Sequence, residues 1–328
     1  MKKIIIVTLL LISQKVVLAD DIFYWKWQLT NGQIKITGSI NHQTEKTVYA
    51  EATITKKRFA LLYWIIDYIE YPKYKVFQKT VDTLSSLLVG PFSSDISKCR
   101  SIIVDLDTSL LNFPIEFLKL KTESIALIRP MVFTIAGNQN DPARESVVLH
   151  KGCIIRDPTS DPENACINIF HSYPGSEFKS AYKITEKDLG LKTGIDFILI
   201  SAHGDADSIT FRGGIALNKI DNVKPGFFKE NNSKVVYVDA CQQGINWTYI
   251  SALAETKEPN FYLGPIISND SGESSTKTIN WFFSFLKQTQ SPVTSIWETR
   301  KKLYRYYNKK INAMDVINKS FIFRIYKI

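Results

Sequence analysis

Two short apolar runs near the middle of the chain constrain its fold most, because each one stops abruptly at a reactive side chain. Residues 197–202 lead straight into His203 and Gly204, and residues 235–238 lead within three positions to Cys241. Runs of this length that are rich in Ile and Val predict buried strands of a parallel sheet. Ligands bind at the carboxyl ends of such strands, so we expect the histidine and the cysteine to face one substrate, as a base and its nucleophile do.

Strand-like and helical patterns alternate from about residue 100 onward. Six runs have the composition of strands: residues 102–106, 125–128, 152–155, 197–202, 235–238 and 261–267. Residues 76–88 place apolar side chains at helical spacing, and Thr185 with Asp188 has the spacing of a capping box that opens a helix before the His203 strand. This alternation predicts an α/β fold with a mainly parallel sheet.

The N-terminal part has a different pattern. An Asn-Gly pair at positions 31–32 is a strong hairpin signal between two alternating stretches, residues 25–29 and 34–36. Residues 48–52 supply a third candidate strand. We therefore predict a small antiparallel β unit within residues 20–75, and its role is left open between a prodomain, a lid and a partner-binding surface.

The first 19 residues have the organisation of a secretory signal peptide. Two lysines precede an apolar run at residues 4–12, and cleavage after Ala19 would leave Asp20 as the first residue. Neither this run nor the apolar residues 59–71 are long enough to span a bilayer. We expect a secreted or periplasmic protein without a stable membrane anchor. The alternative is that residues 1–19 contain an ordinary first strand.

The charge of the chain is mildly basic. The net charge of +9 at neutral pH falls to +6 without the three lysines of the first 19 residues. The densest basic cluster, residues 300–302 with Lys309 and Lys310, has the pattern of a solvated helix face without interleaved aromatic side chains, so we expect no nucleic-acid partner. The chain has no phosphate-binding or dinucleotide-binding glycine motif and no zinc-ligand spacing, so no cofactor or metal is predicted.

Four cysteines, at positions 99, 153, 166 and 241, bear on the chemistry of the protein. A catalytic Cys241 must stay free, and Cys153 with Cys166 is then the most economical disulfide in an exported protein. The alternative is that Cys99, Cys153 and Cys166 are small buried apolar residues, and the sequence is equally compatible with it.

The two reactive runs resemble those of caspase-like cysteine peptidases, in which one apolar strand ends in His-Gly and another ends in a small residue and the nucleophilic Cys. The likeness is greatest to the CHAT family, relatives of caspases and separase, and it extends over roughly residues 80–328. Its other elements, in the order that the family uses, are residues 87–92, 102–105, 111–118 with the pattern L-x-x-P-x-E-x-L, 154–158 ending in Asp-Pro, 261–270, 281–286, 296–303 and 321–325.

This resemblance implies a caspase-like three-layer α/β/α sandwich over residues 76–328 and the activity of a cysteine endopeptidase on protein or peptide substrates. Cys241 is expected to attack the peptide carbonyl and His203 to act as general acid and base, without a tight ion pair between them before substrate binds. The backbone N–H groups of Gly204 and Cys241 are the expected oxyanion hole, since glycine lets the backbone approach the substrate closely.

Substrate selection is assigned through the same resemblance. Asp239 stands two residues before Cys241, where metacaspases carry an Asp that binds a basic side chain, so a preference for Arg or Lys before the scissile bond is implied. The alternative for Asp239 is a hydrogen-bonded structural carboxylate. Asp270, at the end of the next strand-like run, is a second candidate for substrate binding. Three histidines lack a strand-end context and are interpreted as surface or core residues: His42, His150 and His171.

Two other functions are compatible with the sequence. One is a catalytically silent member of the same fold that serves as an exported binding or regulatory module. The other is a thiol enzyme without peptidase activity, such as an acyl transferase. The simplest structural alternative is a buried cysteine and an unrelated histidine, each at a strand end. The sequence carries no signature of an oligomeric state.

Overall fold

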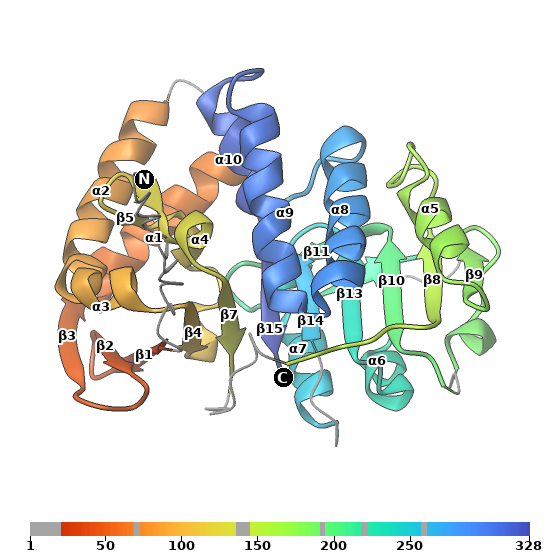
Figure 1. The fold of residues 1–328 in the computed structure, drawn as a ribbon, viewed down its shortest axis with the longest axis horizontal. Coiled ribbons are helices and arrows are strands. Elements are labelled where there is room, and N and C mark those ends of the chain that lie inside the picture. Colours follow the sequence, from red (N-terminus) through yellow and green to blue (C-terminus); the bar gives the residue numbers. More distant parts are fainter. Residues whose placement is uncertain (1–20, 69–72, 136–144, 191–193, 218–221, 257–260) are drawn as a thin grey trace, which may run out of the picture.

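The computed structural model describes residues 21–68, 73–135, 145–190, 194–217, 222–256 and 261–328, so the predicted signal peptide lies outside the described residues. One sheet of eleven strands runs through this part of the chain, with helices packed against it (Figure 1). The strands of the sheet are β1 (Ile22–Thr30), β2 (Gln33–Ile40), β3 (Lys46–Glu51), β4 (Ser101–Leu106), β7 (Met131–Thr134), β8 (Gly152–Arg156), β9 (Glu177–Ser180), β10 (Phe197–Ser201), β13 (Val235–Asp239), β14 (Phe261–Pro265) and β15 (Phe323–Lys327). They lie in the order β3-β2-β1-β4-β7-β15-β14-β13-β10-β8-β9.

The sheet consists of two parallel blocks that run in opposite directions. β9, β8, β10, β13 and β14 are parallel neighbours, and β15, β7, β4 and β1 form the second block. The blocks meet where β15 pairs antiparallel with β14. The carboxyl ends of β8, β10, β13 and β14 therefore share one edge of the sheet, where ligands of α/β proteins bind. The predicted α/β fold with a mainly parallel sheet is confirmed.

Helices cover both faces of the first block. The helices are α1 (Ala52–Asp67), α2 (Tyr74–Leu88), α3 (Ser93–Lys98), α4 (Ile125–Ile128), α5 (Ala165–Ser172), α6 (Pro225–Asn231), α7 (Trp247–Ala254), α8 (Glu273–Thr289), α9 (Pro292–Tyr307) and α10 (Ala313–Phe321). α8 packs against α5 and α9, while α6 packs against α7. α5 connects β8 to β9, whereas α6 and α7 precede β13 and β14 in the other direction along the sheet (Figure 1). Right-handed crossovers therefore place α6 and α7 on the face opposite to α5.

Two two-stranded hairpins complete the strand content. β5 (Lys119–Leu120) pairs antiparallel with β6 (Glu123–Ser124), just before α4. β11 (His203–Ala206) pairs antiparallel with β12 (Gly213–Ala216). The second hairpin follows β10 almost directly and therefore projects from the edge of the sheet at which the first block ends.

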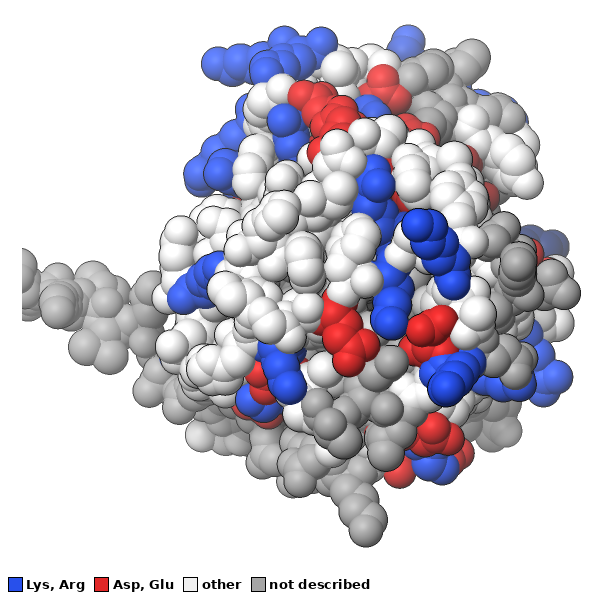
Figure 2. Space-filling view, turned by 90° about the vertical axis from the view of Figure 1, so that its right-hand side faces the viewer, with Lys and Arg blue, Asp and Glu red and all other residues white. Residues whose placement is uncertain are grey.

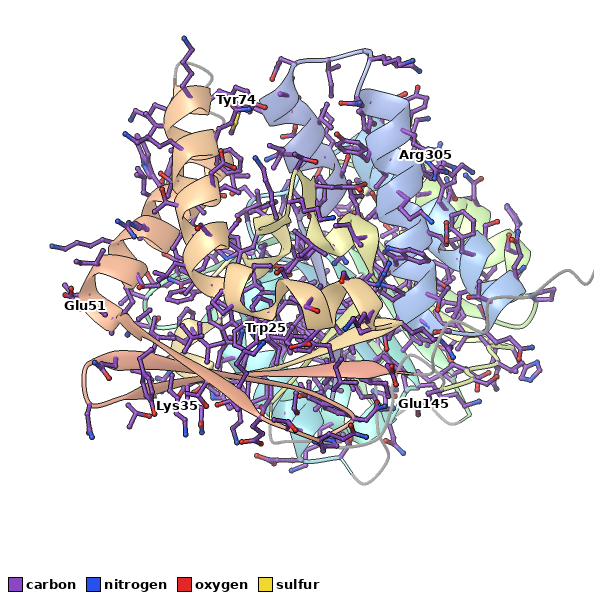
Figure 3. The ribbon with its side chains drawn as sticks, turned by 60° about the vertical axis from the view of Figure 1, so that its left-hand side comes forward. Trp25, Lys35, Glu51, Tyr74, Glu145 and Arg305 are labelled. Atoms are coloured by element: carbon purple, nitrogen blue, oxygen red, sulfur yellow. The ribbon has the colours of Figure 1, made fainter. Side chains whose placement is uncertain are left out.

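The N-terminal β unit continues the central sheet. β1, β2 and β3 pair antiparallel, and the turn at residues 31–32 has positive φ at both positions, 48° and 74°. β1 then pairs in parallel with β4. Trp25 and Trp27 are fully buried, and Trp27 packs against Phe59 of α1. Figure 3 shows Trp25 and Lys35 on opposite sides of these strands, as expected for a sheet with one face packed against helices.

Two local predictions were wrong. Ile125–Ile128 forms the short helix α4 and not a strand, because the Ser124 hydroxyl accepts a hydrogen bond from the Ala126 N–H and so caps a helix start. Arg300 does not belong to a solvated helix face. It is 1% exposed, and its Nη2 donates to the carbonyl oxygen of Phe323, because the helical period turns this position of α9 toward β15.

Other local predictions are confirmed. Residues 76–88 lie within α2. Thr185 and Asp188 form the predicted capping box, although the helix that it opens is a short 3-10 helix, Glu186–Leu189. The strand predicted in residues 321–325 is β15, displaced by two positions because α10 extends into this range.

A buried ion pair fastens the segment before α4 to the last strand. Glu116 and Arg324 are both 0% exposed, and the guanidinium Nε and Nη2 lie 2.6 and 2.7 Å from the two carboxylate oxygens. Arg324 also donates to the carbonyl oxygens of Leu111 and Phe113. The Glu of the L-x-x-P-x-E-x-L element is therefore bound to the interior of the fold, far from solvent.

Charge is dispersed over the surface seen in Figure 2. On this face, lysine and arginine side chains alternate with carboxylates and with uncharged side chains. This pattern agrees with the scattered lysines of the sequence. Within the described ranges, no helix is both long and apolar enough to cross a membrane.

Candidate active site

Two neighbouring strands deliver the predicted catalytic residues to the same level of the sheet. β10 and β13 pair in parallel, with Ser201 opposite Asp239. His203 and Cys241 each follow this register pair by two residues, so they leave the sheet side by side. β8 and β14, the outer neighbours of this pair of strands, end at the same edge and contribute the loops that surround it.

His203 and Cys241 line one small cavity of about 90 Å³. Its other lining residues belong to the strand ends and to the loops beside them: Ser160, Ala202, Asp239, Ala240, Asn269 and Ser271. The N–H of Asn269 lies 3.4 Å from Cys241 Sγ, and Sγ lies 3.8 Å from the carbonyl oxygen of Asn269. No hydrogen bond joins His203 to Cys241 in the described part of the chain. The two reactive side chains therefore share a cavity while the backbone of Asn269 holds the thiol.

The ring of His203 is oriented by a hydroxyl group. Nε2 of His203 lies 2.8 Å from Oγ1 of Thr159. Thr159 Oγ1 donates its single hydrogen to Asp157 Oδ1 at 2.7 Å, so it must accept from the Nε2–H of His203. This hydrogen bond selects the neutral tautomer with the proton on Nε2 and leaves Nδ1 with a free lone pair. A base that takes a proton from a thiol needs such a nitrogen.

The loop that carries Thr159 is anchored by Arg156, the last residue of β8. Arg156 Nε lies 2.9 Å from Asp161 Oδ2, and Nη2 lies 2.6 Å from both the Asp161 carbonyl oxygen and Asn164 Oδ1. Asp161 is 1% exposed and also accepts hydrogen bonds from two N–H groups that begin α5. The loop is thus tied to both β8 and α5, which restricts the position of the Thr159 hydroxyl.

Gly204 allows its strand to approach the loop that carries Cys241. A Cβ atom at position 204 would lie 2.9 Å from Ala240 Cβ and 3.0 Å from both Gln243 Nε2 and the carbonyl oxygen of Gly214. Any side chain would push these segments apart, since the interior is closely packed. The N–H of Cys241 donates to no residue that the structure describes. Both predicted oxyanion-hole residues thus lie where β11 and the loop after β13 approach each other closely.

Gln243 joins the hairpin after β10 to the cysteine loop. Its side chain is fully buried, and Nε2 lies 2.9 Å from the carbonyl oxygen of Asp205, 3.1 Å from that of Gly214 and 3.0 Å from that of Cys241. Its Oε1 accepts from Asn246 Nδ2 at 2.8 Å. One amide therefore sets the spacing between the segment that begins at the histidine and the segment that holds the thiol.

The glycine three positions after Cys241 has a packing role. A Cβ atom on Gly244 would collide with the carbonyl oxygen of Gly264 on β14. Tyr326 Oη donates to the carbonyl oxygen of Gly244 at 2.7 Å, and Tyr262 Oη donates to that of the preceding residue at 3.0 Å. The loop behind the thiol is pressed against β14 and held by two buried tyrosines, so its backbone is rigid.

The surroundings of Cys241 keep its thiol protonated at rest. Burial raises the pKa of the Cys241 thiol above its ordinary value, and the Asn269 N–H that donates to Sγ opposes this shift. The carboxylates of Asp239 and Asp67 raise the same pKa further. A protonated thiol is a weak nucleophile, so attack on a carbonyl at neutral pH requires a base that removes the proton.

Asp239 is buried, and both of its carboxylate oxygens accept hydrogen bonds. Oδ2 lies 2.9 Å from Ser201 Oγ and 2.5 Å from Ser275 Oγ, and Oδ1 lies 2.5 Å from Asn269 Nδ2. Burial raises the pKa of this carboxyl to about 6, although its hydrogen-bond donors act in the opposite direction. A basic substrate side chain would have to displace one of these donors, which favours the structural interpretation of Asp239.

Asp270, the second predicted substrate-binding residue, is directed elsewhere. Its carboxylate is 50% exposed and lies 3.2 Å from Lys319 Nζ, and it is absent from the described lining of the cavity. His42, His150 and His171 are exposed, away from this edge of the sheet. Of the predicted acidic and histidine positions outside the dyad, only Asp239 therefore lines the cavity of His203 and Cys241 as the structure describes it.

The remaining cysteines are structural. None of the four cysteines forms a disulfide, and Cys99, Cys153 and Cys166 are buried. Of the two interpretations of these residues, the structure favours small buried apolar side chains over a Cys153–Cys166 disulfide. The described residues contain no group of three or more His, Cys, Asp or Glu side chains that could hold a metal ion.

Comparison with known proteins adds no assignment: no protein-family model matches the chain, and no curated protein matches it. Three residues of the site escaped prediction from sequence, namely Thr159, Gln243 and Asn269. Each follows the end of a strand, and each makes its contact across strands that are neighbours in space but separated in the chain. The only signal that could have found Thr159 is its place directly after the Asp-Pro end of a predicted strand.

Proposed function

We propose that this chain is an exported cysteine-type endopeptidase of the caspase-like kind, with Cys241 as nucleophile and His203 as general acid and base. One observation carries the proposal. The thiol and the imidazole share a cavity at the carboxyl ends of adjacent parallel strands, and the histidine tautomer leaves Nδ1 unprotonated. A buried structural cysteine would need no oriented histidine beside it.

In the proposed reaction His203 first takes a proton from the Cys241 thiol and later gives it to the leaving amine. The Cys241 thiol gives its proton to Nδ1 of His203 as Sγ forms a bond to the peptide carbonyl carbon. The negative charge on the carbonyl oxygen is stabilised by the N–H groups of Gly204 and Cys241. The C–N bond then breaks, and the Nδ1 proton passes to the leaving amine. Water, deprotonated by the same nitrogen, hydrolyses the thioester and restores the thiol.

Thr159 and Asp157 support this cycle without touching the substrate. When His203 takes up a proton at Nδ1, its Nε2–H still donates to Thr159, whose hydroxyl is polarised by the Asp157 carboxylate. The chain of two hydrogen bonds holds the ring in one orientation through both protonation states. These two residues are therefore positioning residues, and the chemistry stays with the histidine and the cysteine.

The proposed location is outside the cytoplasm, either secreted or periplasmic, and it rests on the signal-peptide pattern of residues 1–19. N-terminal sequencing of the protein recovered from outside the expressing cells tests it. We expect the chain to begin at Asp20. Recovery of an uncleaved chain from the cytoplasm alone would contradict export.

The decisive experiment measures peptide turnover and thiol reactivity together. Mature protein beginning at Asp20 is assayed under reducing conditions with fluorogenic peptides that carry Arg, Lys, Asp or Leu before the scissile bond, beside Cys241→Ala and His203→Ala. Turnover that disappears in both variants is the expected result. Labelling of Cys241 by iodoacetamide without any turnover would indicate a thiol enzyme of another class. A silent and unlabelled protein would indicate a binding module.

A further inference from the structure

A second cavity, of about 310 Å³, lies beside the cysteine loop, and the N-terminal helix α1 supplies four of its ten described lining residues. Gln242, the residue after the nucleophile, contributes to its wall, as do residues of the loop after β11. It is more than three times as large as the cavity that holds His203 and Cys241. The residues of this cavity that carry its chemistry are Tyr63, Trp64, Asp67, Tyr68, Asp207 and Gln242.

The cavity is acidic. Its described lining includes the carboxylates of Asp67 and Asp207 and no lysine, arginine or histidine. Asp67 Oδ1 accepts from the N–H of Ser268 at 2.6 Å, while Oδ2 accepts no hydrogen bond from a described residue. Asp207 is more fully bonded, because the N–H groups of Ile209 and Thr210 donate to its Oδ1 and the Thr210 side chain also bonds to its carboxylate. Asp67 therefore keeps one oxygen free to bind a cation, and Asp207 adds a second carboxylate to the wall of the cavity.

Aromatic side chains complete the cavity. Tyr63 is only 7% exposed, and its hydroxyl has no hydrogen-bond partner among the described residues. Trp64 and Tyr68 stand at the mouth with 37% and 67% exposure. The ammonium of Lys73 lies 3.7 Å from the centroid of the Trp64 ring, so this ring already attracts a cation. An unpartnered buried hydroxyl costs free energy unless a ligand satisfies it.

The cavity is close to the nucleophile. Asp67 is bonded to the N–H of Ser268, and the next residue, Asn269, is the one whose N–H donates to Cys241 Sγ. Consecutive residues make these two contacts, so the Asp67 carboxylate lies within about 10 Å of the sulfur. A long side chain on a peptide residue next to the scissile bond spans such a distance, and a short one does not.

We propose that this cavity binds a lysine or arginine side chain of the peptide substrate, with Asp67 as its main counter-charge. The inference deepens the proposed peptidase function and rests on it. It also gives a role to the N-terminal segment, because α1 then supplies one wall of a substrate pocket. A guanidinium or ammonium group would donate hydrogen bonds to the free Asp67 oxygen and to the Tyr63 hydroxyl oxygen, between aromatic rings that favour cations.

The first test scans substrate specificity. Internally quenched peptides place Lys, Arg, norleucine or Glu at each of three positions on both sides of the scissile bond. We expect one position at which the basic residue raises kcat/KM over norleucine by roughly tenfold or more. Asp67→Asn keeps the acceptor for Ser268 and should abolish this preference. The matched variant Asp82→Asn, an exposed acid of α2 that pairs with Lys119, should leave the preference intact.

The second test needs no catalysis. Agmatine, which carries the side-chain guanidinium of arginine, is titrated into Cys241→Ala protein by calorimetry, with the Asp67→Asn change added in a second sample. Agmatine binding that is at least fivefold weaker with Asp67→Asn supports the pocket, whether or not any peptide is cleaved. If agmatine binds in this way but no peptide is cleaved, the peptidase proposal fails and the pocket proposal stands. The opposite result is that Asp67→Asn still cleaves peptides, with the same preference for basic residues and the same affinity for agmatine. That result would contradict the proposed pocket but not the proposed peptidase activity.

Discussion

Nε2 of His203 lies 2.8 Å from the hydroxyl oxygen of Thr159, and the same hydroxyl donates to Asp157 at 2.7 Å. These two hydrogen bonds determine which ring nitrogen carries the proton, because Thr159 has a single hydrogen to give. They also determine how the imidazole faces the cavity. The relationship joins β8 to β10, and it makes the loop after β8 part of the proposed active site.

Thr159→Val should slow the enzyme without unfolding it. Valine has the shape of threonine but cannot accept from His203, so the tautomer and the ring orientation are no longer fixed. We expect kcat/KM to fall by about tenfold, in line with the loss of one or two hydrogen bonds. Thr159→Ser retains the hydroxyl and should restore most of the rate at an equal melting temperature. Equal rates for the two variants would show that the hydroxyl plays no part.

Gly204→Ala should damage both stability and activity. The added Cβ would press on Ala240, Gly214 and Gln243 at about 3 Å. We expect the free energy of unfolding to fall by about 1–3 kcal/mol, as in other overpacked sites. A displaced N–H at the oxyanion hole should lower kcat by roughly a hundredfold.

A matched glycine provides the control for this change. In Gly226→Ala the new Cβ has Glu230 Oε1, at 3.4 Å, as its nearest neighbour in helix α6. Helix propensity then favours alanine by about 0.5–1 kcal/mol, so this variant should be as stable as the parent or more stable. Equal destabilisation of the two variants, measured by urea unfolding, would contradict a special packing requirement at position 204.

Much of the central sheet could be predicted from the sequence, because buried strands of a parallel sheet are almost uniformly apolar. Residues 102–106, 152–155 and 235–238 all lie within observed strands. Ile125–Ile128 has the same composition yet forms a helix, since one capping contact from Ser124 decides a segment of only four residues. Composition alone cannot separate the two cases.

The placement of His203 and Cys241 at neighbouring strand ends could be predicted for a similar reason, and the residues that support them could not. His203 and Cys241 stand directly at the ends of apolar runs, where local sequence carries the signal. Thr159 and Asp67 act through contacts that depend on strand order, and β8 lies beside β10 only because the chain doubles back through β9. Such an arrangement leaves no periodicity in the sequence.

Gln243→Leu should uncouple the two loops of the site. The change keeps the approximate volume but leaves the carbonyl oxygens of Asp205, Gly214 and Cys241 without their donor. An unsatisfied buried acceptor costs about 1–3 kcal/mol, so we expect a lower free energy of unfolding and a reduced kcat. Gln288→Leu, at an exposed position of α8, should change neither. A fully active Gln243→Leu enzyme would rule out a positioning role.

Glu116→Gln should be among the most destabilising single changes in the protein. It leaves the buried Arg324 guanidinium without its counter-charge, and breaking one partner of such a pair costs about 3–5 kcal/mol. Glu298→Gln removes a partly exposed helix pair with Lys301 and should cost less than about 1 kcal/mol. Chemical denaturation of both variants measures the difference, and equal losses would show that burial does not matter here.

The buried carboxyl of Asp239 should make stability depend on pH in a defined direction. Its pKa in the folded protein is about 6, above the value of about 3.9 for an exposed Asp, so the folded state holds this proton more tightly than the unfolded state. The stability contributed by the protonated carboxyl is fully present below about pH 4. It is lost as the pH rises through about 6, and the total loss by pH 7 is about 3 kcal/mol.

Asp239→Asn removes this titration because an amide stays neutral throughout the range. The free energy of unfolding of the variant, minus that of the parent, should therefore increase by about 2–3 kcal/mol between pH 4 and pH 7. Urea unfolding at four pH values in that range measures the difference, and any pH-independent cost of the amide cancels. For Asp82→Asn the difference in the free energy of unfolding between variant and parent should change by less than about 0.5 kcal/mol over this pH range, since that carboxylate is 60% exposed. A flat difference for Asp239→Asn as well would mean that the parent carboxyl titrates as it does in the unfolded chain, and that its burial is relieved by its three donors.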